Sequence, residues 1–222
     1  MRYKAVLFDM DGTVLDTVDD LADSVNASLR EFSLPEVSRS HVSRCLGNGA
    51  AYLIRNCLPD NTPETVFEQV LAFYKPWYGA HCRIKTKPYE GVLPLMEALR
   101  GEGVRQAIIS NKPDGAVQEL AEAFFPGLMD VVVGESPAIR RKPSPDMFFA
   151  AVSRMGMAVP ECVYIGDTEV DIETARNAGM DCITVSWGFR TEEQLLAAGA
   201  AEIVRSPEEL KTKLLGWREL NQ

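Results

Sequence analysis

The sequence predicts an α/β fold, in which a doubly wound, Rossmann-like parallel sheet forms the core and an α-helical cap domain is inserted into it. Two patterns indicate this fold class. From residue 88 onward, short apolar runs alternate with amphipathic helical segments, which is typical of parallel sheets covered by helices. Residues 16–84 show four helical segments in succession with no strand among them, as in a helical bundle. We therefore expect residues 1–15 and 85–222 to form the core and residues 16–84 to form the cap.

The core elements follow from apolar runs and helical periodicity, with glycine and proline at their ends. Residues 5–8 are apolar without polar alternation, which predicts a strand buried on both faces of a parallel sheet. Further strands are expected at 105–110, 131–133, 163–166, 182–185 and near 203, and helices at 92–100, 114–124, 144–155, 171–178, 192–198 and 207–215. The cap is therefore inserted directly after the first strand.

The four cap helices are predicted from apolar residues that recur at steps of three and four. Proline or glycine ends each of the first three, and Thr62-Pro63 gives the fourth an N-cap followed by proline at its first position. The expected helices are 18–32, 38–46, 50–58 and 63–77.

The composition is that of an ordinary globular protein: 222 residues, 46% hydrophobic and 25% charged. This length allows one substantial core and a small accessory unit. The net charge of -9 disfavours non-specific binding to nucleic acid or anionic lipid, because both select for basic patches. The run of three basic residues at 140–142 is too short for a nucleic-acid arm. We expect no nucleic acid and no membrane as partners, and a monomer or homodimer.

The cysteines are odd in number, widely spaced and without a CxxC pair, so we expect reduced thiols, mostly in the core. They are Cys45, Cys57, Cys82, Cys162 and Cys182. With only His41 and His81 available, the spacing does not suggest a zinc site, and we assign no metal role to either histidine. The apolar strand begins almost at the N-terminus, which leaves no room for a signal peptide. We therefore expect a cytoplasmic protein.

Two acids follow the first strand directly. Asp9 and Asp11 would lie at the carboxyl edge of the sheet, where open α/β folds bind their ligands. Acids spaced by one residue repel each other, so a metal, a proton or a nearby base usually offsets their charge. Gly12 allows a sharp turn beyond them. Taken alone, the stretch also fits an aspartate-rich turn that closes a strand.

Three more polar groups lie at or just past predicted strand ends. Ser110 offers a hydroxyl next to the backbone amides of Asn111 and its neighbours, which can donate to phosphoryl oxygens, although a helix-capping serine explains it equally well. Lys142 could neutralise a carboxylate and a transferring phosphoryl group; most lysines are solvated, but the flanking prolines fix its backbone. Asp167 and Asp171 offer hard oxygen ligands for Mg²⁺, unless Asp171 only serves the helix that follows it.

In this order, the sequence patterns DxDGT, Ser, Lys-Pro and GDxxxD resemble the four motifs of the haloacid dehalogenase superfamily of phosphotransferases. The resemblance covers the α/β core from end to end, and the helical insertion resembles the C1 cap of that family. Among subfamilies, the chain resembles phosphoglycolate phosphatase and its near relatives. One departure is Glu90, where relatives often carry a second proline; it lies in the cap hinge.

The resemblance implies a Mg²⁺-dependent phosphomonoester hydrolase that forms an aspartyl-phosphate. Asp9 would be the nucleophile, and Asp11 would protonate the leaving oxygen and then activate water. The Asp9 carboxylate, the Asp11 backbone carbonyl and Asp167 would hold Mg²⁺, with Asp171 orienting the metal site. The phosphoryl group would be bound by Ser110 and Lys142, with added donors from the amides near Gly12, Thr13 and Asn111.

The cap is expected to select the substrate, because the core motifs contact only the transferring group. Arg44, next to the Gly47-Asn48-Gly49 turn, is our candidate for a substrate contact, and a solvated helix arginine is the alternative. A small carboxylated phosphoester such as 2-phosphoglycolate fits the resemblance.

Alternative functions share some of these features. A sugar phosphomutase of the β-phosphoglucomutase type, or a pyrophosphatase, has every core motif and stays open. A haloacid dehalogenase would not need Asp11, and a phosphonatase would lack an acid there. Outside this superfamily, a nucleotide-binding module is disfavoured because the chain has no GxxxxGK[ST] run. A phosphate-sensing regulator with decayed catalytic residues is disfavoured because all motif acids are present.

Overall fold

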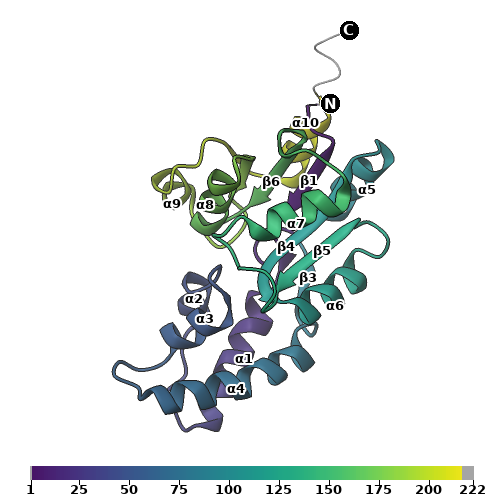
Figure 1. Cartoon of the computed structure of the whole chain (residues 1–222). Helices are drawn as coiled ribbons and strands as arrows, with labels where there is room; N and C mark the ends of the chain where they lie inside the picture. Colours follow the sequence, from purple (N-terminus) through teal and green to yellow (C-terminus); the bar gives the residue numbers. More distant parts are fainter. Residues whose placement is uncertain (1, 217–222) are drawn as a thin grey trace. The chain divides into compact units, whose positions relative to one another are not determined.

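The computed structural model describes residues 2–216 (Figure 1). Met1 and residues 217–222, which the sequence assigns to the core, lie outside the described residues. Between residues 2 and 216, none of the helices is long and apolar enough to cross a membrane. None of the five cysteines, all of which lie among the described residues, forms a disulfide; four of them are buried and Cys182 is half-buried.

The chain forms two compact units. One combines the residues up to Leu15 with those from Pro88 onward, and the other consists of Asp16–Lys87. The chain passes between the units at two short strands, β2 (Leu15–Asp16) and β3 (Lys87–Pro88), which form a two-stranded sheet. Because two residues carry no periodic signal, neither strand was predicted from the sequence.

The first unit is built on a six-stranded parallel sheet, which confirms the predicted fold class. The strands, in their spatial order, are β5 (Val131–Glu135), β4 (Arg105–Pro113), β1 (Ala5–Phe8), β6 (Cys162–Gly166), β7 (Asp181–Val185) and β8 (Ile203–Val204). Strand β1 lies in the middle, with Leu7 opposite Ala107 on one side and Tyr164 on the other. Its residues are at most 1% exposed, which explains their uniformly apolar sequence.

Helices connect the strands of this unit as predicted, with small shifts at their ends. They are α5 (Val92–Gly101), α6 (Asp114–Phe124), α7 (Asp146–Met155), α8 (Glu169–Ala178), α9 (Glu192–Ala197) and α10 (Pro207–Leu215), together with a 3₁₀ turn, η1 (Val159–Glu161). One face of the sheet packs against α7 and α8, where Leu7 and Tyr164 share a buried cluster with Phe148 and Ala175. The ring centroids of Phe148 and Tyr164 are 4.3 Å apart.

Strand β4 is longer than predicted. It continues to Pro113 after a register shift that follows Ile109, and it pairs with β5 again at Glu135. Ser110, Asn111 and Lys112 therefore belong to the strand and are at most 6% exposed. Ser110 ends the predicted strand, whereas the polar character of Asn111 and Lys112 indicates a loop on sequence grounds; the sheet instead buries all three at its carboxyl edge.

The second unit contains the four predicted helices. They are α1 (Val18–Glu31), α2 (Arg39–Arg44), α3 (Gly49–Cys57) and α4 (Glu64–His81). Helix α1 packs against α4 and α2, and α3 packs against α4 (Figure 1). Helix α4 begins one residue later than predicted and extends past Trp77, with Pro76 inside it. The buried carboxylate of Asp20 accepts the backbone N–H groups of Lys85 and Thr86 at 2.9 and 2.8 Å, which fixes the end of this unit onto α1.

Candidate active site

Strand β1 places two carboxylates at the carboxyl edge of the sheet. The backbone N–H of Asp9 donates to the carbonyl of Ile165 at 2.8 Å, so the pairing with β6 extends through this residue. Met10 is fully buried in the core, whereas the side chain of Asp11 remains 19% exposed. Asp9 is itself only 5% exposed. The first motif therefore presents one buried acid and one accessible acid.

Two glycines make room for a third carboxylate, that of Asp167. Gly12 has a φ of 86°, and a Cβ on Gly12 or on Gly188 would overlap Oδ2 of Asp167. Asp167 is fully buried; its Oδ1 accepts the Thr13 hydroxyl at 2.9 Å, and its Oδ2 accepts the backbone N–H of Phe189 at 2.7 Å. The turn after β1 and the loop after β7 thus hold this carboxylate together.

Lys142 supplies the ammonium at the centre of the site. Its Nζ donates to Oδ1 of Asp9 at 2.8 Å, to Oδ1 of Asp171 at 2.8 Å and to the hydroxyl of Tyr164 at 2.9 Å. Burial lowers the pKa of Lys142, but the carboxylates of Asp171 and Asp9 outweigh it and raise that pKa above its ordinary value. The side chain is therefore a fixed positive charge.

The backbone of Lys142 is held by a side chain from another motif. The amide of Asn111 donates from Nδ2 to the Lys142 carbonyl at 3.0 Å, and its Oδ1 accepts the Lys142 N–H at 2.8 Å. The peptide bond between Lys142 and Pro143 is cis. Asn111 was predicted near the phosphoryl group through its backbone amide; its side chain instead fixes the segment from which the lysine extends.

Asp171 is saturated with hydrogen bonds. Its Oδ1 accepts from Lys142 and from the Tyr164 hydroxyl, and its Oδ2 accepts from the Thr168 N–H, the Thr168 hydroxyl and the Asp167 N–H. A carboxylate has about four lone-pair sites, so these donors occupy its whole capacity. Although burial raises the pKa of Asp171, the charge of Lys142 and these hydrogen bonds hold it below its ordinary value.

The other two buried acids are not compensated in this way. One oxygen from each of Asp9, Asp167 and Asp171 lies within 4.8 Å of the others. Burial raises the pKa of Asp9 to about 7. The negative charge of Asp171 adds to this shift, and the positive charge of Lys142 opposes it. Burial and the charges of Asp171 and Asp9 raise the pKa of Asp167 well above its ordinary value. Both shifts reflect the cost of ionising neighbouring acids away from water.

This donor set fits Mg²⁺. Asp9 and Asp167 supply hard carboxylate oxygens, and a divalent cation beside them would favour their ionised forms, which burial and the neighbouring acids disfavour. Asp171 is less able to bind a cation, because its two carboxylate oxygens already accept hydrogen bonds from five donors. The chemistry of the site therefore separates two carboxylates that can bind a cation from one that positions the lysine.

Sequence reasoning gave no role to two residues of this site. The Nζ of Lys112 lies 2.9 Å from Oδ1 of Asp11, and the Lys112 side chain is only 4% exposed. Tyr164 bridges Lys142 and Asp171. A signal existed for both residues: Lys112 adjoins the predicted Ser110-Asn111 pair, and Tyr164 is a hydroxyl-bearing residue inside an apolar strand.

Ser110 belongs to the same unit as this cluster of residues, whereas Arg44 belongs to the other unit. Ser110 is 2% exposed on β4, and its Oγ accepts the backbone N–H of Lys112 at 3.2 Å. Arg44 is the last residue of α2 and is exposed. It lies in the second unit, whereas every other predicted site residue belongs to the first. The substrate role of Arg44 stays a prediction.

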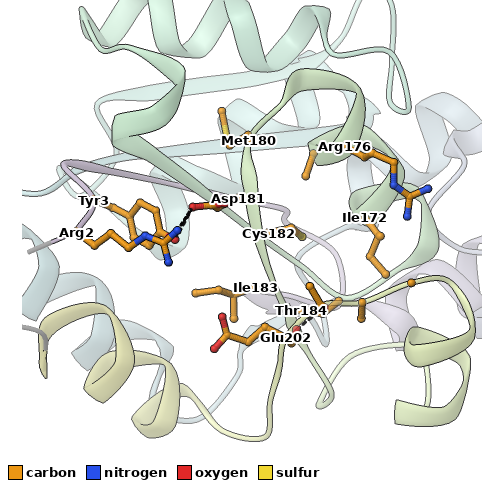
Figure 2. Close-up of a pocket in the computed structure, with 14 residues that line it drawn as sticks. Arg2, Tyr3, Ile172, Arg176, Met180, Asp181, Cys182, Ile183, Thr184 and Glu202 are labelled. Atoms are coloured by element: carbon orange, nitrogen blue, oxygen red, sulfur yellow. Dashed lines mark hydrogen bonds and ion pairs between the residues drawn. The ribbon is translucent and has the colours of Figure 1, made fainter.

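Two cavities of the first unit can be compared as candidate catalytic sites. One, of about 570 Å³, is lined by residues from Glu135 to Ser144 and includes Lys142. The other, of about 430 Å³, lies at the opposite end of the sheet, where β7 starts (Figure 2). There Arg2 and Tyr3 both donate to Asp181, at 2.7 and 2.8 Å. Because those polar groups satisfy one another, the carboxyl edge is the better candidate for catalysis.

Known proteins share both the sequence and the fold. A model of the family described as haloacid dehalogenase-like hydrolase matches residues 6–185. A phosphoglycolate phosphatase from Rhodospirillum rubrum is 30% identical over 209 residues, which cover 90% of this chain and 86% of that protein. An N-acetylmuramic acid 6-phosphate phosphatase from Pseudomonas aeruginosa is 30% identical over 212 residues, or 95% and 94% of the two chains. The crystal structure of a candidate phosphoglycolate phosphatase from Lactobacillus delbrueckii superposes with a TM-score of 0.92, at 40% identity, and covers 97% of this chain and 100% of that one.

Proposed function

Because the chain belongs to the haloacid dehalogenase-like hydrolase family and is a phosphatase, we propose that it hydrolyses small phosphomonoesters with Mg²⁺ through an aspartyl-phosphate. The observation that carries this proposal is the pairing of a buried carboxylate, Asp9, with a buried ammonium, Lys142, at the end of the central strand. Asp11 follows two residues later and stays partly accessible. A nucleophile, a proton shuttle and a fixed cation are the parts that phosphoryl transfer needs.

Asp9 is the proposed nucleophile. Lys142 holds its Oδ1, so Oδ2 is the oxygen that attacks phosphorus while the bond from phosphorus to the leaving oxygen breaks. The same ammonium neutralises charge on the transferring group. Ser110 is proposed as a further donor to the phosphoryl oxygens. The backbone N–H groups of Gly12 and Thr13, predicted as added donors, already donate to the carbonyls of Leu15 and Met10 within the turn, at 2.9 and 3.4 Å.

Asp11 is the proposed acid and base. It gives a proton to the leaving oxygen in the first step and takes one from water in the second, so that water cleaves the aspartyl-phosphate and regenerates Asp9. The Nζ of Lys112, 2.9 Å from Oδ1 of Asp11, places a positive charge beside that carboxylate. The pairing leaves Oδ2 of Asp11 as the oxygen that carries the proton.

Mg²⁺ would be held by the carboxylates of Asp9 and Asp167 and by the backbone carbonyl of Asp11. When bound, it supplies positive charge beside the phosphoryl oxygens and offsets the repulsion between these two acids. Asp171 acts on Lys142 and on the turn at Asp167 rather than as a direct ligand, because both of its oxygens are already engaged.

The proposed substrate class is a phosphomonoester that also carries a carboxylate. Phosphoglycolate and N-acetylmuramic acid 6-phosphate, the compounds in the names of the two curated relatives, both have this pair of groups. The core motifs address the phosphoryl group, so the carboxylate needs a separate cation. Arg44 on the exposed end of α2 is the proposed partner, and 2-phosphoglycolate is the compound to test first.

The test is a screen of the purified protein with Mg²⁺, in which released phosphate is measured for matched compounds. The panel contains 2-phosphoglycolate, N-acetylmuramic acid 6-phosphate, a hexose phosphate without a carboxylate, pyrophosphate and an aryl phosphate. We expect the highest kcat/KM for a carboxylated phosphomonoester. Preferred cleavage of pyrophosphate, or isomerisation of the hexose phosphate without phosphate release, would favour the pyrophosphatase or phosphomutase alternative. A folded protein that binds phosphate and hydrolyses nothing would indicate a regulator.

A further inference from the structure

A second cluster of metal-ligating side chains lies in the helical unit, separate from the carboxylates. A ring nitrogen of His41 and the sulfur atoms of Cys45 and Cys57 all lie within 4.8 Å of one another. Cys45 is 8% exposed, Cys57 is 2% exposed and His41 is half-buried. The sequence spacing gave no reason to expect a zinc site here, and it is the fold that brings the three residues together.

The local structure explains how they meet. His41 and Cys45 are four residues apart on α2 and its C-cap, so their side chains share one face. Cys57 is the last residue of α3, and the two helices are in contact. Between them the chain turns through Gly47 and Gly49, whose φ angles of 106° and 79° favour glycine. This turn lets α3 bring its C-terminal end to that of α2.

The imidazole of His41 is held by a hydrogen bond to the backbone. Its Nε2 lies 2.7 Å from the carbonyl oxygen of Asn56. Because a carbonyl only accepts, Nε2 carries the hydrogen, and the neutral ring keeps the lone pair on Nδ1. Metal-bound histidines commonly donate their other N–H to a backbone carbonyl, which fixes the tautomer and the ring plane.

The charges of the ligands and of the ion would balance. Coordination deprotonates a thiol, so each cysteine would bind a thiophilic dication as a thiolate. Two thiolates, one dication and a neutral imidazole sum to zero charge, which suits a buried position.

We propose that His41, Cys45 and Cys57 form a binding site for one thiophilic divalent cation, with Zn²⁺ as its preferred member. Binding forms two metal–sulfur bonds and one metal–nitrogen bond and releases two protons, and water completes a tetrahedral set. With Zn–S bonds of about 2.3 Å and Zn–N bonds of about 2.0 Å, a bound ion would hold the three ligand atoms closer together than the 4.8 Å within which they lie here. Sulfur and imidazole select against Mg²⁺, so this site and the carboxylate cluster take different ions.

The ion would join the C-terminal ends of α2 and α3 and thereby fix the Gly47-Asn48-Gly49 turn between them. Removing it should loosen the segment from His41 to Cys57 while leaving the parallel sheet intact. The occupancy of this site can be measured without reference to catalysis.

The experiment titrates Zn²⁺ into the reduced, metal-free protein in competition with a chromophoric chelator, with excess Mg²⁺ to occupy the carboxylates. We expect one Zn²⁺ per chain and two protons released per ion. Cys57→Ser and Cys45→Ser should weaken binding by at least about 100-fold, because even changes around the ligands cost about 10- to 100-fold. Cys82→Ser removes another buried thiol of the same unit and should leave binding unchanged.

A second measurement on the unaltered protein does not depend on how the variants fold. Co²⁺ in place of Zn²⁺ should give the near-ultraviolet charge-transfer band of cobalt–thiolate bonds, which oxygen ligands do not produce. Absence of the band, equal Zn²⁺ binding by Cys57→Ser and the unaltered protein, or an equal loss in Cys82→Ser would overturn the proposal. So would a reduced protein that forms a Cys45–Cys57 disulfide in air in the presence of Zn²⁺.

Discussion

The ammonium of Lys142 donates to Oδ1 of Asp9 at 2.8 Å, although the two residues are 133 positions apart and both are almost completely buried. This contact joins the segment that precedes α7 to the end of β1. It also fixes one oxygen of the proposed nucleophile and leaves the other for attack. Breaking the pair should therefore impair folding and catalysis together.

We expect Lys142→Met to lower kcat at least 10²- to 10³-fold, the usual effect of removing one preorganised donor. It should also lower the free energy of unfolding by about 3–5 kcal/mol, because Asp9 and Asp171 are left without their buried counter-ion. Urea unfolding and steady-state kinetics measure both quantities.

The matched control is Lys4→Met, which removes a lysine that is paired with Glu161 on the surface. Exposed ion pairs contribute little, so this variant should keep both its stability and its activity. If Lys142→Met unfolds at the same urea concentration as the unaltered protein, the buried pair does not stabilise the core.

Metal removal is the next prediction. Hydrolysis of an aryl phosphate should disappear with EDTA and return with Mg²⁺, because Asp9 and Asp167 offer hard oxygen ligands. Asp167→Asn should raise the Mg²⁺ concentration needed for half-maximal activity, since a neutral amide replaces an anionic ligand. Full activity in EDTA would contradict the metal assignment.

One variant tests whether the helical unit determines the preference for a carboxylated substrate. We expect Arg44→Ala to raise KM for the best carboxylated substrate about tenfold or more, with little change for an aryl phosphate, because loss of a charge-assisted hydrogen bond costs about 1.5–3 kcal/mol. Arg39→Ala is the control on the same helix; its guanidinium pairs with Asp19. Equal effects on both substrates would give Arg44 a general role.

The sequence was sufficient to predict the parts of this protein that depend on local pattern. An apolar run followed by acids predicted β1, and the three- and four-residue spacing predicted all four helices of Asp16–Lys87. The parallel order of the strands then implied that Asp9 and Lys142 lie at one edge of the sheet.

Features that depend on tertiary contacts were not predictable in this way. The polar end of β4 looks like a loop until its neighbours bury it, so the position of Lys112 beside Asp11 was missed. Tyr164 looks like one more strand residue until Lys142 reaches its hydroxyl. The His41, Cys45 and Cys57 cluster forms only because two helix ends meet, which spacing along the chain cannot show.

The last prediction separates the two acids of the first motif. Asp9→Asn keeps the shape of the side chain but removes the anionic nucleophile, so turnover should fall below detection and no phosphoenzyme should form. Asp11→Asn removes only the proton shuttle, which a poor leaving group needs far more than a good one. It should lose most activity toward an alkyl phosphate and retain more toward an activated aryl phosphate.

The measurements are kcat on both substrates for each variant and a trapping assay with radiolabelled phosphate. Asp11→Asn keeps the backbone carbonyl assigned to Mg²⁺, so its dependence on Mg²⁺ should change little and serves as the internal control. If Asp9→Asn still accumulates a phosphoenzyme, another residue attacks phosphorus. If Asp11→Asn slows both substrates by the same factor, Asp11 does not act by protonating the leaving oxygen, and the pairing with Lys112 would then have a purely structural purpose.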